Sequence, residues 1–342
     1  MANPSLSAGV INGNRELAVQ QLPIPELGDD EVRVDVAYCG LCGSDLHLFF
    51  GPPEPVAGHV LGHEFSGTIG EVGTRVTGWR TGDRVAIRPI DACGDCAACR
   101  DEDGVCISGL MRGPGLGRAG GLAASVTVPA QMLHRVPDGL SLRDAALAEP
   151  LAVAVRGVRR GRVSEQAAVI VMGAGPIGLL TLEVLQARGI SRVLIVEPNP
   201  ERRAAVAPAE VVTVHPSDMA SAAAQHFPQG IDAVFDCSGQ PGCAQEACNV
   251  VGYGGRVVIL GVPEAPSEVH LMTVAVNELS IIGSTAHSRS EFDEALDLLA
   301  SERIDTARLI SSVIGLEDAD AKLRELASGA SKDVKVLVMH GQ

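Results

Sequence analysis

The chain has 342 residues, of which 46% are apolar and 20% are charged, and its formal net charge is −15. This length favours two domains, and the composition is that of a folded globular protein. The negative charge disfavours nucleic acid and anionic membrane surfaces as partners, because both would repel the protein. Residues 1–20 lack the basic and apolar regions of a secretory signal, so a cytoplasmic location is expected.

The first half of the chain predicts short strands separated by glycine-rich turns. Apolar and polar residues alternate over 31–39, as in a half-buried strand, and 64–73 and 83–90 continue in that manner. From about residue 167, apolar strands alternate with helical stretches, which indicates a parallel sheet covered on both faces. A final strand is predicted over 333–341, and we expect this tail to return to the first domain.

A glycine pattern after an apolar strand predicts a dinucleotide site. The pattern G-x-G-x-x-G permits a tight turn, close approach of a pyrophosphate and close helix packing. Glu197 ends the next strand, where a carboxylate can bind both ribose hydroxyls and disfavour a 2′-phosphate. NAD is therefore predicted, while Arg202 and Arg203 leave NADP open; the competing interpretation is an ordinary glycine-rich turn. The predicted cofactor contacts are Gly173, Gly175, Pro176, Ile177, Gly178, Glu197 and Arg202.

Four of the nine cysteines lie within fourteen residues in the pattern C-x2-C-x2-C-x6-C. They are Cys93, Cys96, Cys99 and Cys106. Four thiolates can close a tetrahedral shell around zinc and leave no open position, so such a site would stabilise a loop. An iron–sulfur cluster is the alternative, although the spacing matches none of the usual ferredoxin patterns. Acidic neighbours disfavour a nucleic-acid zinc ribbon.

A second group of metal-binding side chains is spread over the first half. A catalytic zinc needs three or four protein ligands and one position open to substrate. Cys42 can supply a thiolate, and the segment GHEFSG adds His63 and Glu64. Glu149 lies near the point where short strands and glycine-rich turns give way to alternating strands and helices. A redox pair of Cys39 with Cys42 is the competing interpretation, since they form C-x-x-C.

Three further polar residues follow Cys42. Ser44 and His47 lie two and five residues after Cys42, and their plain interpretations are an ordinary turn residue and a surface or core histidine. Asp45 is expected to hold the loop through backbone hydrogen bonds.

The motifs GLCGSDLH, LGHEFSG, the cysteine lobe, AEPLAVAV and GAGPIG occur in this order. Together they resemble the zinc-dependent medium-chain dehydrogenase/reductase superfamily over nearly the whole chain. With Glu149 in the motif AEPLAVAV, the chain is most similar to the sorbitol, butanediol and threonine dehydrogenase branch. The resemblance implies a GroES-like, β-rich catalytic domain over 1–154 and 288–342. It also implies a Rossmann domain for NAD over 155–287.

The resemblance also implies a role for each candidate residue. The catalytic zinc would be held by Cys42, His63 and Glu149, with Glu64 as a direct or exchangeable ligand. Ser44 would hydrogen-bond the substrate oxygen, and His47 would pass the proton toward solvent. The structural zinc would be held by Cys93, Cys96, Cys99 and Cys106.

The expected activity is reversible, zinc-dependent hydride transfer between NAD and a secondary alcohol or polyol. One alternative is a biosynthetic dehydrogenase of a cyclitol, an amino sugar or another tailored hydroxyl. Another is a redox sensor that binds zinc and NAD without turnover. The resemblance implies a homodimer or homotetramer, and the apolar segment 278–285 is the candidate for pairing between subunits.

Overall fold

The computed structural model describes residues 5–51, 57–206, 211–263, 265–329 and 331–341. The chain forms two compact units. Unit 1 comprises Met1–Glu149, Ser288–Glu302 and Thr306–Gln342, and unit 2 comprises Pro150–His287 and Arg303–Asp305. Within the described ranges, no helix combines the length and the apolar character that a membrane span requires.

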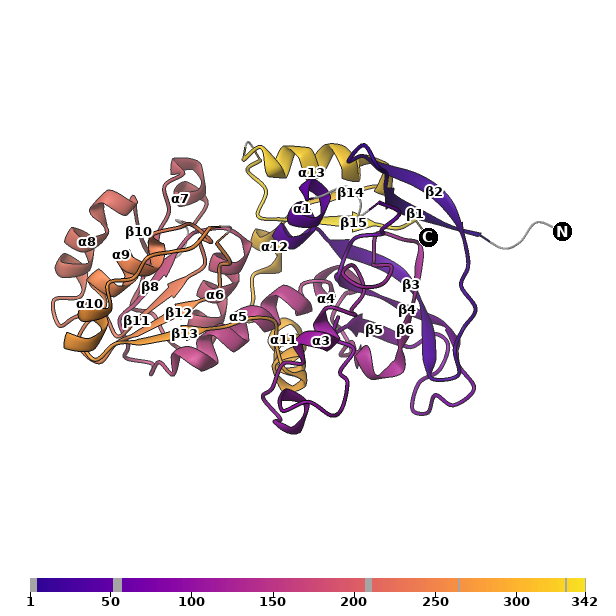
Figure 1. Cartoon of the computed structure of the whole chain (residues 1–342), viewed down its shortest axis with the longest axis horizontal. Helices are drawn as coiled ribbons and strands as arrows, with labels where there is room; N and C mark the ends of the chain where they lie inside the picture. Colours follow the sequence, from indigo (N-terminus) through magenta and orange to yellow (C-terminus); the bar gives the residue numbers. More distant parts are fainter. Residues whose placement is uncertain (1–4, 52–56, 207–210, 264, 330, 342) are drawn as a thin grey trace. The chain divides into compact units, whose positions relative to one another are not determined.

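Unit 1 is rich in strands (Figure 1). Its strands are β1 (Ser5–Ile11), β2 (Leu17–Pro23), β3 (Glu31–Gly40), β4 (Glu64–Val72), β5 (Arg84–Ile87), β6 (Ser125–Pro129), β7 (Leu133–Arg135), β14 (Ile310–Ile314) and β15 (Lys335–Met339). Its helices are α1 (Gly43–Phe50), α3 (Ile107–Leu110), α4 (Leu142–Ala145), α11 (Arg289–Ala300), α12 (Thr306–Leu309) and α13 (Ala319–Ala327), and its short 3₁₀ turns are η1 (Ala98–Arg100), η2 (Ala130–Met132) and η4 (Leu316–Asp318).

The main sheet of unit 1 is organised around β3. The strand order is β14-β15-β3-β4-β5-β7, with β6 also paired to β3, while β1 and β2 form a separate antiparallel pair. Val32, Val34 and Val36 of β3 are buried, as the predicted alternation requires. The predicted final strand is β15, which pairs antiparallel to β3 and places Val338 opposite Cys39. The tail therefore does return to the sheet of the first half.

Unit 2 contains a six-stranded parallel sheet in the order β10-β9-β8-β11-β12-β13. Its strands are β8 (Val169–Met172), β9 (Val193–Val196), β10 (Val212–Val214), β11 (Ala233–Asp236), β12 (Arg256–Ile259) and β13 (Ser280–Gly283). Its helices are α6 (Pro176–Ala187), α7 (Pro200–Val206), α8 (Met219–His226), α9 (Cys243–Val250) and α10 (Leu271–Val276), with the turn η3 (Pro216–Asp218). Helix α5 (Ala148–Gly161) starts with the last two residues of the first segment of unit 1 and continues into unit 2.

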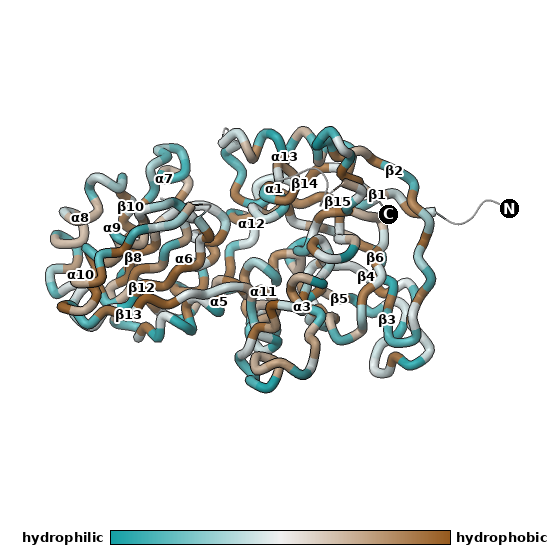
Figure 2. The backbone as a smooth tube through the Cα atoms, in the orientation of Figure 1, coloured by the Kyte–Doolittle hydropathy of each residue, from teal (hydrophilic) through white to brown (hydrophobic). Residues whose placement is uncertain are grey.

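The sheet of unit 2 is an apolar layer between helices. Every residue of β8, β9 and β11 is buried, and Figure 2 shows hydrophobic colours along the central strands of this sheet. Continuous apolar strands are expected where helices cover both faces of a parallel sheet. A β-rich unit and a doubly wound parallel unit together confirm the predicted fold class.

Candidate metal centres and dinucleotide site

The structure brings three of the predicted zinc ligands together in unit 1. The thiol of Cys42, the imidazole of His63 and the carboxylate of Glu64 each offer a ligand atom within 4.8 Å of the others. Cys42 immediately precedes α1, and Glu64 is the first residue of β4. The sheet therefore supplies the carboxylate, and the loops beside it supply the thiolate and the imidazole.

Asp45 connects the two loops. Its fully buried carboxylate accepts hydrogen bonds from the backbone N–H of Cys42 at 2.9 Å and of Gly62 at 3.3 Å. These two bonds confirm its predicted role in holding the loop. Oδ1 of Asp45 also lies 3.5 Å from Nδ1 of His63, at the outer limit of a hydrogen bond. Burial lowers the pKa of His63, but the negative charges of Asp45 and Cys42 outweigh burial and raise that pKa well above its ordinary value.

Gly62 determines how the chain reaches His63. Its φ is +97°, and a Cβ there would lie 2.5 Å from the sulfur of Cys39 and 2.9 Å from the amide nitrogen of Leu122. Only glycine fits this left-handed, crowded position. With Nδ1 of His63 facing Asp45, the other ring nitrogen, Nε2, points away from it.

The hydroxyl of Ser44 lies where His63 Nε2 and the Cys42 sulfur converge. Ser44 Oγ is 3.2 Å from Nε2 of His63 and 3.3 Å from Sγ of Cys42. It is half-buried on the first turn of α1. The Ser44 hydroxyl therefore stands beside two of the three grouped ligand atoms.

A lysine that the sequence reasoning did not single out holds Glu64. Nζ of Lys335 lies 2.8 and 2.7 Å from the two carboxylate oxygens of Glu64, and it also donates to the carbonyl of Leu41 at 3.1 Å. Both side chains of the pair are at most 3% exposed. Gly40 leaves room for the carboxylate, since a Cβ there would lie 2.1 Å from Oε2 of Glu64.

Glu149 and His47 lie apart from the three grouped ligands. Glu149 is buried at the start of α5, and its ligand oxygens are not within the 4.8 Å group. Its charge nevertheless acts on Glu64. Burial raises the pKa of Glu64, Lys335 lowers it, and Glu149 raises it again. His47 is exposed in the last turn of α1.

The charges and donors of this site suit a divalent cation. Three acidic side chains, Cys42, Asp45 and Glu64, lie there, and the buried Lys335 pairs with Glu64. The charge of Glu149 also acts on Glu64. Thiolate, imidazole and carboxylate are the ligands that zinc takes in proteins, and buried charges of one sign require compensation. The residues present therefore fit a zinc ion.

The four-cysteine lobe has the dimensions of a tetrathiolate site. Sulfur separations are 3.8 Å for Cys93 and Cys99, 3.9 Å for Cys96 and Cys106, and 3.6 Å for Cys93 and Cys106. A tetrahedron with zinc–sulfur bonds of 2.3 Å has edges of about 3.8 Å. All four cysteines are free, and the backbone N–H of Gly109 donates to the sulfur of Cys106 at 3.3 Å. The lobe thus fits a closed metal site.

The glycine pattern of unit 2 has three distinct environments. Gly173 follows β8 with φ +97°. A Cβ at Gly178 would lie 1.9 Å from the carbonyl oxygen of Gly173, so this contact requires glycine. A Cβ at Gly175 would meet no protein atom within 4 Å. Pro176 and Ile177 then form the first turn of α6. Open space before a helix N-terminus suits a pyrophosphate.

The carboxylate of Glu197 closes over this loop. Oε2 accepts from the backbone N–H of Ala174 at 2.8 Å, and Oε1 accepts from Asn199 at 2.9 Å. The guanidinium of Arg203 donates to the carbonyls of Glu197 and Pro198 at 2.6 and 2.7 Å, so it stabilises the turn. Arg202 is half-buried, and its backbone N–H donates to Asn199.

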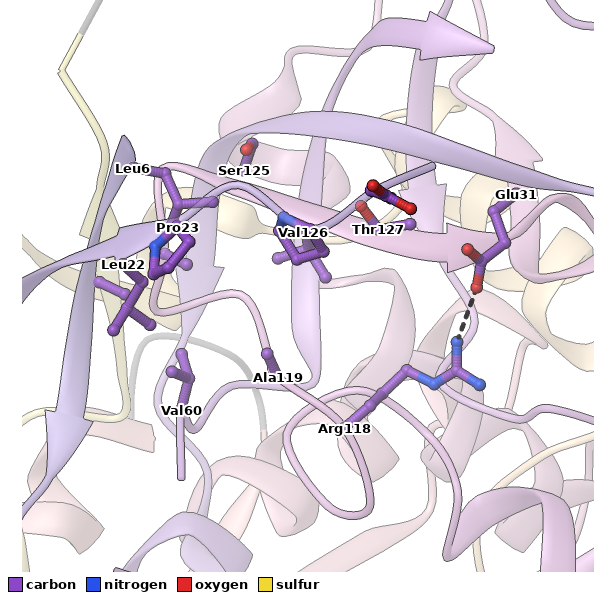
Figure 3. Close-up of a pocket in the computed structure, with 14 residues that line it drawn as sticks. Leu6, Leu22, Pro23, Glu31, Val60, Arg118, Ala119, Ser125, Val126 and Thr127 are labelled. Atoms are coloured by element: carbon purple, nitrogen blue, oxygen red, sulfur yellow. Dashed lines mark ion pairs between the residues drawn. The ribbon is translucent and has the colours of Figure 1, made fainter. Parts of the chain in front are cut away.

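A separate pocket of about 260 Å³ lies in unit 1 (Figure 3). Apolar side chains such as Leu6, Leu22 and Val126 line it, and the ion pair of Arg118 with Glu31, at 3.6 Å, lies at one side. None of the predicted site residues lines this pocket, so we do not assign the chemistry to it.

The β-rich unit contains two cysteine-containing ligand groups, and the parallel unit contains an open glycine loop. Together these features define a zinc- and nicotinamide-dependent dehydrogenase. Residues 28–138 match the GroES-like domain of alcohol dehydrogenases, and residues 176–301 match the zinc-binding dehydrogenase family. The chain belongs to the zinc-dependent medium-chain dehydrogenase/reductase superfamily, and it is an oxidoreductase that acts on CH–OH groups.

Three similar proteins illustrate this relationship. A 2-dehydro-3-deoxy-L-galactonate 5-dehydrogenase of Pseudoalteromonas atlantica is 34% identical, with 92% of each chain covered. A probable D-xylulose reductase A of Neosartorya fischeri is 32% identical, with 96% of this chain and 95% of that protein covered. The structure of an alcohol dehydrogenase of Escherichia coli complexed with NADH has a TM-score of 0.89 and 26% identity, and the likeness covers 98% of this chain and 99% of that one.

Proposed function

We propose that this protein is an NAD-dependent, zinc-dependent dehydrogenase of a secondary hydroxyl in a polyhydroxylated molecule, reversible with the ketone. The observation that carries the proposal is the grouping of Cys42, His63 and Glu64 within 4.8 Å, with the hydroxyl of Ser44 beside two of them. The catalytic role is assigned to residues 1–154 and 288–342, and the cofactor role to 155–287.

Each residue of the first site has a proposed task. Cys42, His63 and Glu149 hold the catalytic zinc, and Glu64 serves as a direct or exchangeable ligand. A bound zinc would act as a Lewis acid on the substrate oxygen, and nicotinamide would accept the hydride. Ser44 hydrogen-bonds that oxygen and takes its proton, and His47 on the same helix passes the proton to solvent.

The proposed cofactor is NAD, bound at the glycine loop of unit 2. The buried carboxylate of Glu197 beside the loop would repel a 2′-phosphate. Arg203 is engaged with two backbone carbonyls, which leaves Arg202 as the cation to contact the cofactor. Ile177 contributes a backbone N–H and Pro176 an apolar contact at the start of α6.

The proposed substrate class rests on the relatives. Two of them are named for oxidoreduction of a sugar acid and of a ketopentose, and both compounds carry several hydroxyl groups. A second zinc in the lobe of Cys93, Cys96, Cys99 and Cys106 is proposed to be structural. The nine free cysteines suit a reducing cytoplasm.

A homodimer or homotetramer is proposed, in which β13 pairs between subunits. This strand is at the edge of the parallel sheet, so one side of its backbone is available to pair with a second copy. Ile281 on β13 is 41% exposed, and Leu271 and Val276 on α10 are also exposed. Size-exclusion chromatography tests this assignment, and a 35 kDa monomer would overturn it.

The experiment that tests the function follows reduced nicotinamide at 340 nm with a panel of diols, polyols, sugar acids and amino alcohols. Each substrate is offered with NAD and with NADP. We expect at least one polyhydroxylated secondary alcohol to be oxidised with NAD preferred. If no compound is oxidised by zinc-loaded protein, the sensor alternative is favoured over the dehydrogenase.

A further inference from the structure

Arg88 is a buried cation without a carboxylate partner. It directly follows β5, and only 7% of its surface is exposed. Its Nε has no hydrogen-bond partner, and in the described part of the chain no carboxylate lies within ion-pair distance of its guanidinium. A buried charge is unfavourable unless something compensates it. Arg88 therefore requires a source of negative charge.

The other arginines around the lobe have polar partners. Arg112 lies 3.8 Å from a carboxylate oxygen of Asp91, and Arg118 lies 3.0 Å from the same oxygen. Arg100 donates to the carbonyl of Asp95 at 2.6 Å. Arg88 differs from all three because it is the more buried and has no such contact.

The backbone after Arg88 packs directly against the lobe. The N–H of Asp91 donates to the carbonyl of Gly109 at 3.0 Å, and Gly109 donates to the sulfur of Cys106 at 3.3 Å. A Cβ at Gly113 would lie 2.0 Å from the carbonyl oxygen of Pro89. These close contacts fix the position of β5 and the segment after it relative to Cys106.

The charges that act on Arg88 come partly from the lobe. Burial and the nearby Arg289 lower the pKa of Arg88 to about 10, while Cys99, Asp293 and Cys106 oppose this shift. Arg88 therefore stays protonated at neutral pH. The carboxylate of Asp293 is engaged with Nδ1 of His134 at 2.5 Å. Asp293 keeps its negative charge in this contact, so it acts on Arg88 together with the thiolates of Cys99 and Cys106.

We propose that Arg88 is the buried counter-cation of the four-cysteine metal site. Four thiolates around one divalent zinc carry a formal charge of about −2, and a guanidinium held nearby in a poorly solvated region offsets part of it. Arg88 thereby stabilises the metal-loaded lobe, as a residue outside the ligand shell. This inference depends on the structural zinc of the proposed function.

The test is zinc retention by the purified, zinc-loaded enzyme during exposure to a chromophoric chelator. The variant Cys96→Ala identifies the fraction of zinc that belongs to the lobe. We expect Arg88→Met to weaken retention of that zinc by about 10- to 100-fold, the usual effect of losing a partner outside the ligand shell. Arg88→Lys should retain most of it. Arg100→Met, which removes an exposed cation of the same lobe, should match the wild type.

A second measurement is specific to charge. In cobalt-loaded protein, loss of a nearby cation raises the energy of the sulfur electrons, so the thiolate-to-cobalt absorption should move to longer wavelength in Arg88→Met and stay in place in Arg100→Met. Unchanged retention and absorption in Arg88→Met would overturn the inference. Misfolding of both Arg88→Met and Arg88→Gln, under conditions where Cys96→Ala folds, would also overturn the inference. A wild type without zinc in the lobe would instead refute the structural zinc itself.

Discussion

The ammonium of Lys335 spans both oxygens of Glu64, at 2.8 and 2.7 Å, in the interior of unit 1. Substitution by Met would leave the carboxylate buried without its partner, which typically costs about 3–5 kcal/mol of unfolding free energy. Urea denaturation of Lys335→Met measures this loss.

Lys322→Met is the matched control for that substitution. Lys322 pairs with Glu325 at 2.6 Å and Asp333 at 3.0 Å nearer the surface, where an ion pair contributes about 0–1 kcal/mol. Equal losses in the two variants would show that the Lys335 pair has no special importance. In Lys335→Met combined with Glu64→Gln, we expect part of the stability to return.

Substitutions at Gly175 and Gly178 distinguish an effect on cofactor binding from an effect on folding. The Cβ that Gly175→Ala adds would have no protein atom within 4 Å, and the φ of −76° at this position is accessible to alanine. We expect nearly unchanged stability and a KM for NAD raised by about tenfold or more, because the added methyl group occupies space intended for the pyrophosphate.

Gly178→Ala is the comparison variant. Its Cβ would lie 1.9 Å from the carbonyl oxygen of Gly173, so the backbone must shift, and stability should fall by about 1–3 kcal/mol. Thermal denaturation and the KM for NAD are measured for both. A destabilised Gly175→Ala with normal KM would contradict the assignment of this loop.

The proton path predicts a change in the pH–rate profile of His47→Asn. Without the imidazole, the path from Ser44 to solvent loses its final group, and kcat should fall most where proton release limits the rate. His226→Asn, which changes an exposed histidine of α8, should keep the wild-type profile. An unaltered profile in His47→Asn would remove this residue from the mechanism.

The sequence was sufficient for the fold class and for the local motifs. Alternation over 31–39 predicted β3, and the glycine pattern predicted the turn between β8 and α6. Such signals are local, because each residue set lies within one strand or one turn.

Lys335 could not be assigned in the same way. It lies 271 positions after Glu64, and only the pairing of β15 with β3 brings the two together. Its one sequence signal is a charged residue at the start of an otherwise apolar strand. Arg88 gives a similar signal directly after β5, and the absence of a carboxylate near it becomes evident only in three dimensions.

The two cysteine groups predict opposite effects of substitution. Cys42→Ala should remove one zinc per chain and abolish turnover while leaving a folded protein. Cys96→Ala should also remove one zinc, but its main effect should be lower thermal stability, since a closed site stabilises its loop. Cys248→Ala, in a buried position of unit 2, should keep both metals. Full turnover by Cys42→Ala would refute the catalytic assignment.

Anomalous diffraction at the zinc absorption edge from crystals of the full chain tests the central claim most directly. We expect two zinc peaks per chain, one bonded to Cys42 and His63 and one surrounded by the four cysteines of the lobe. A map with no zinc peak between Cys42 and His63, from protein that oxidises an alcohol with NAD, would contradict the account.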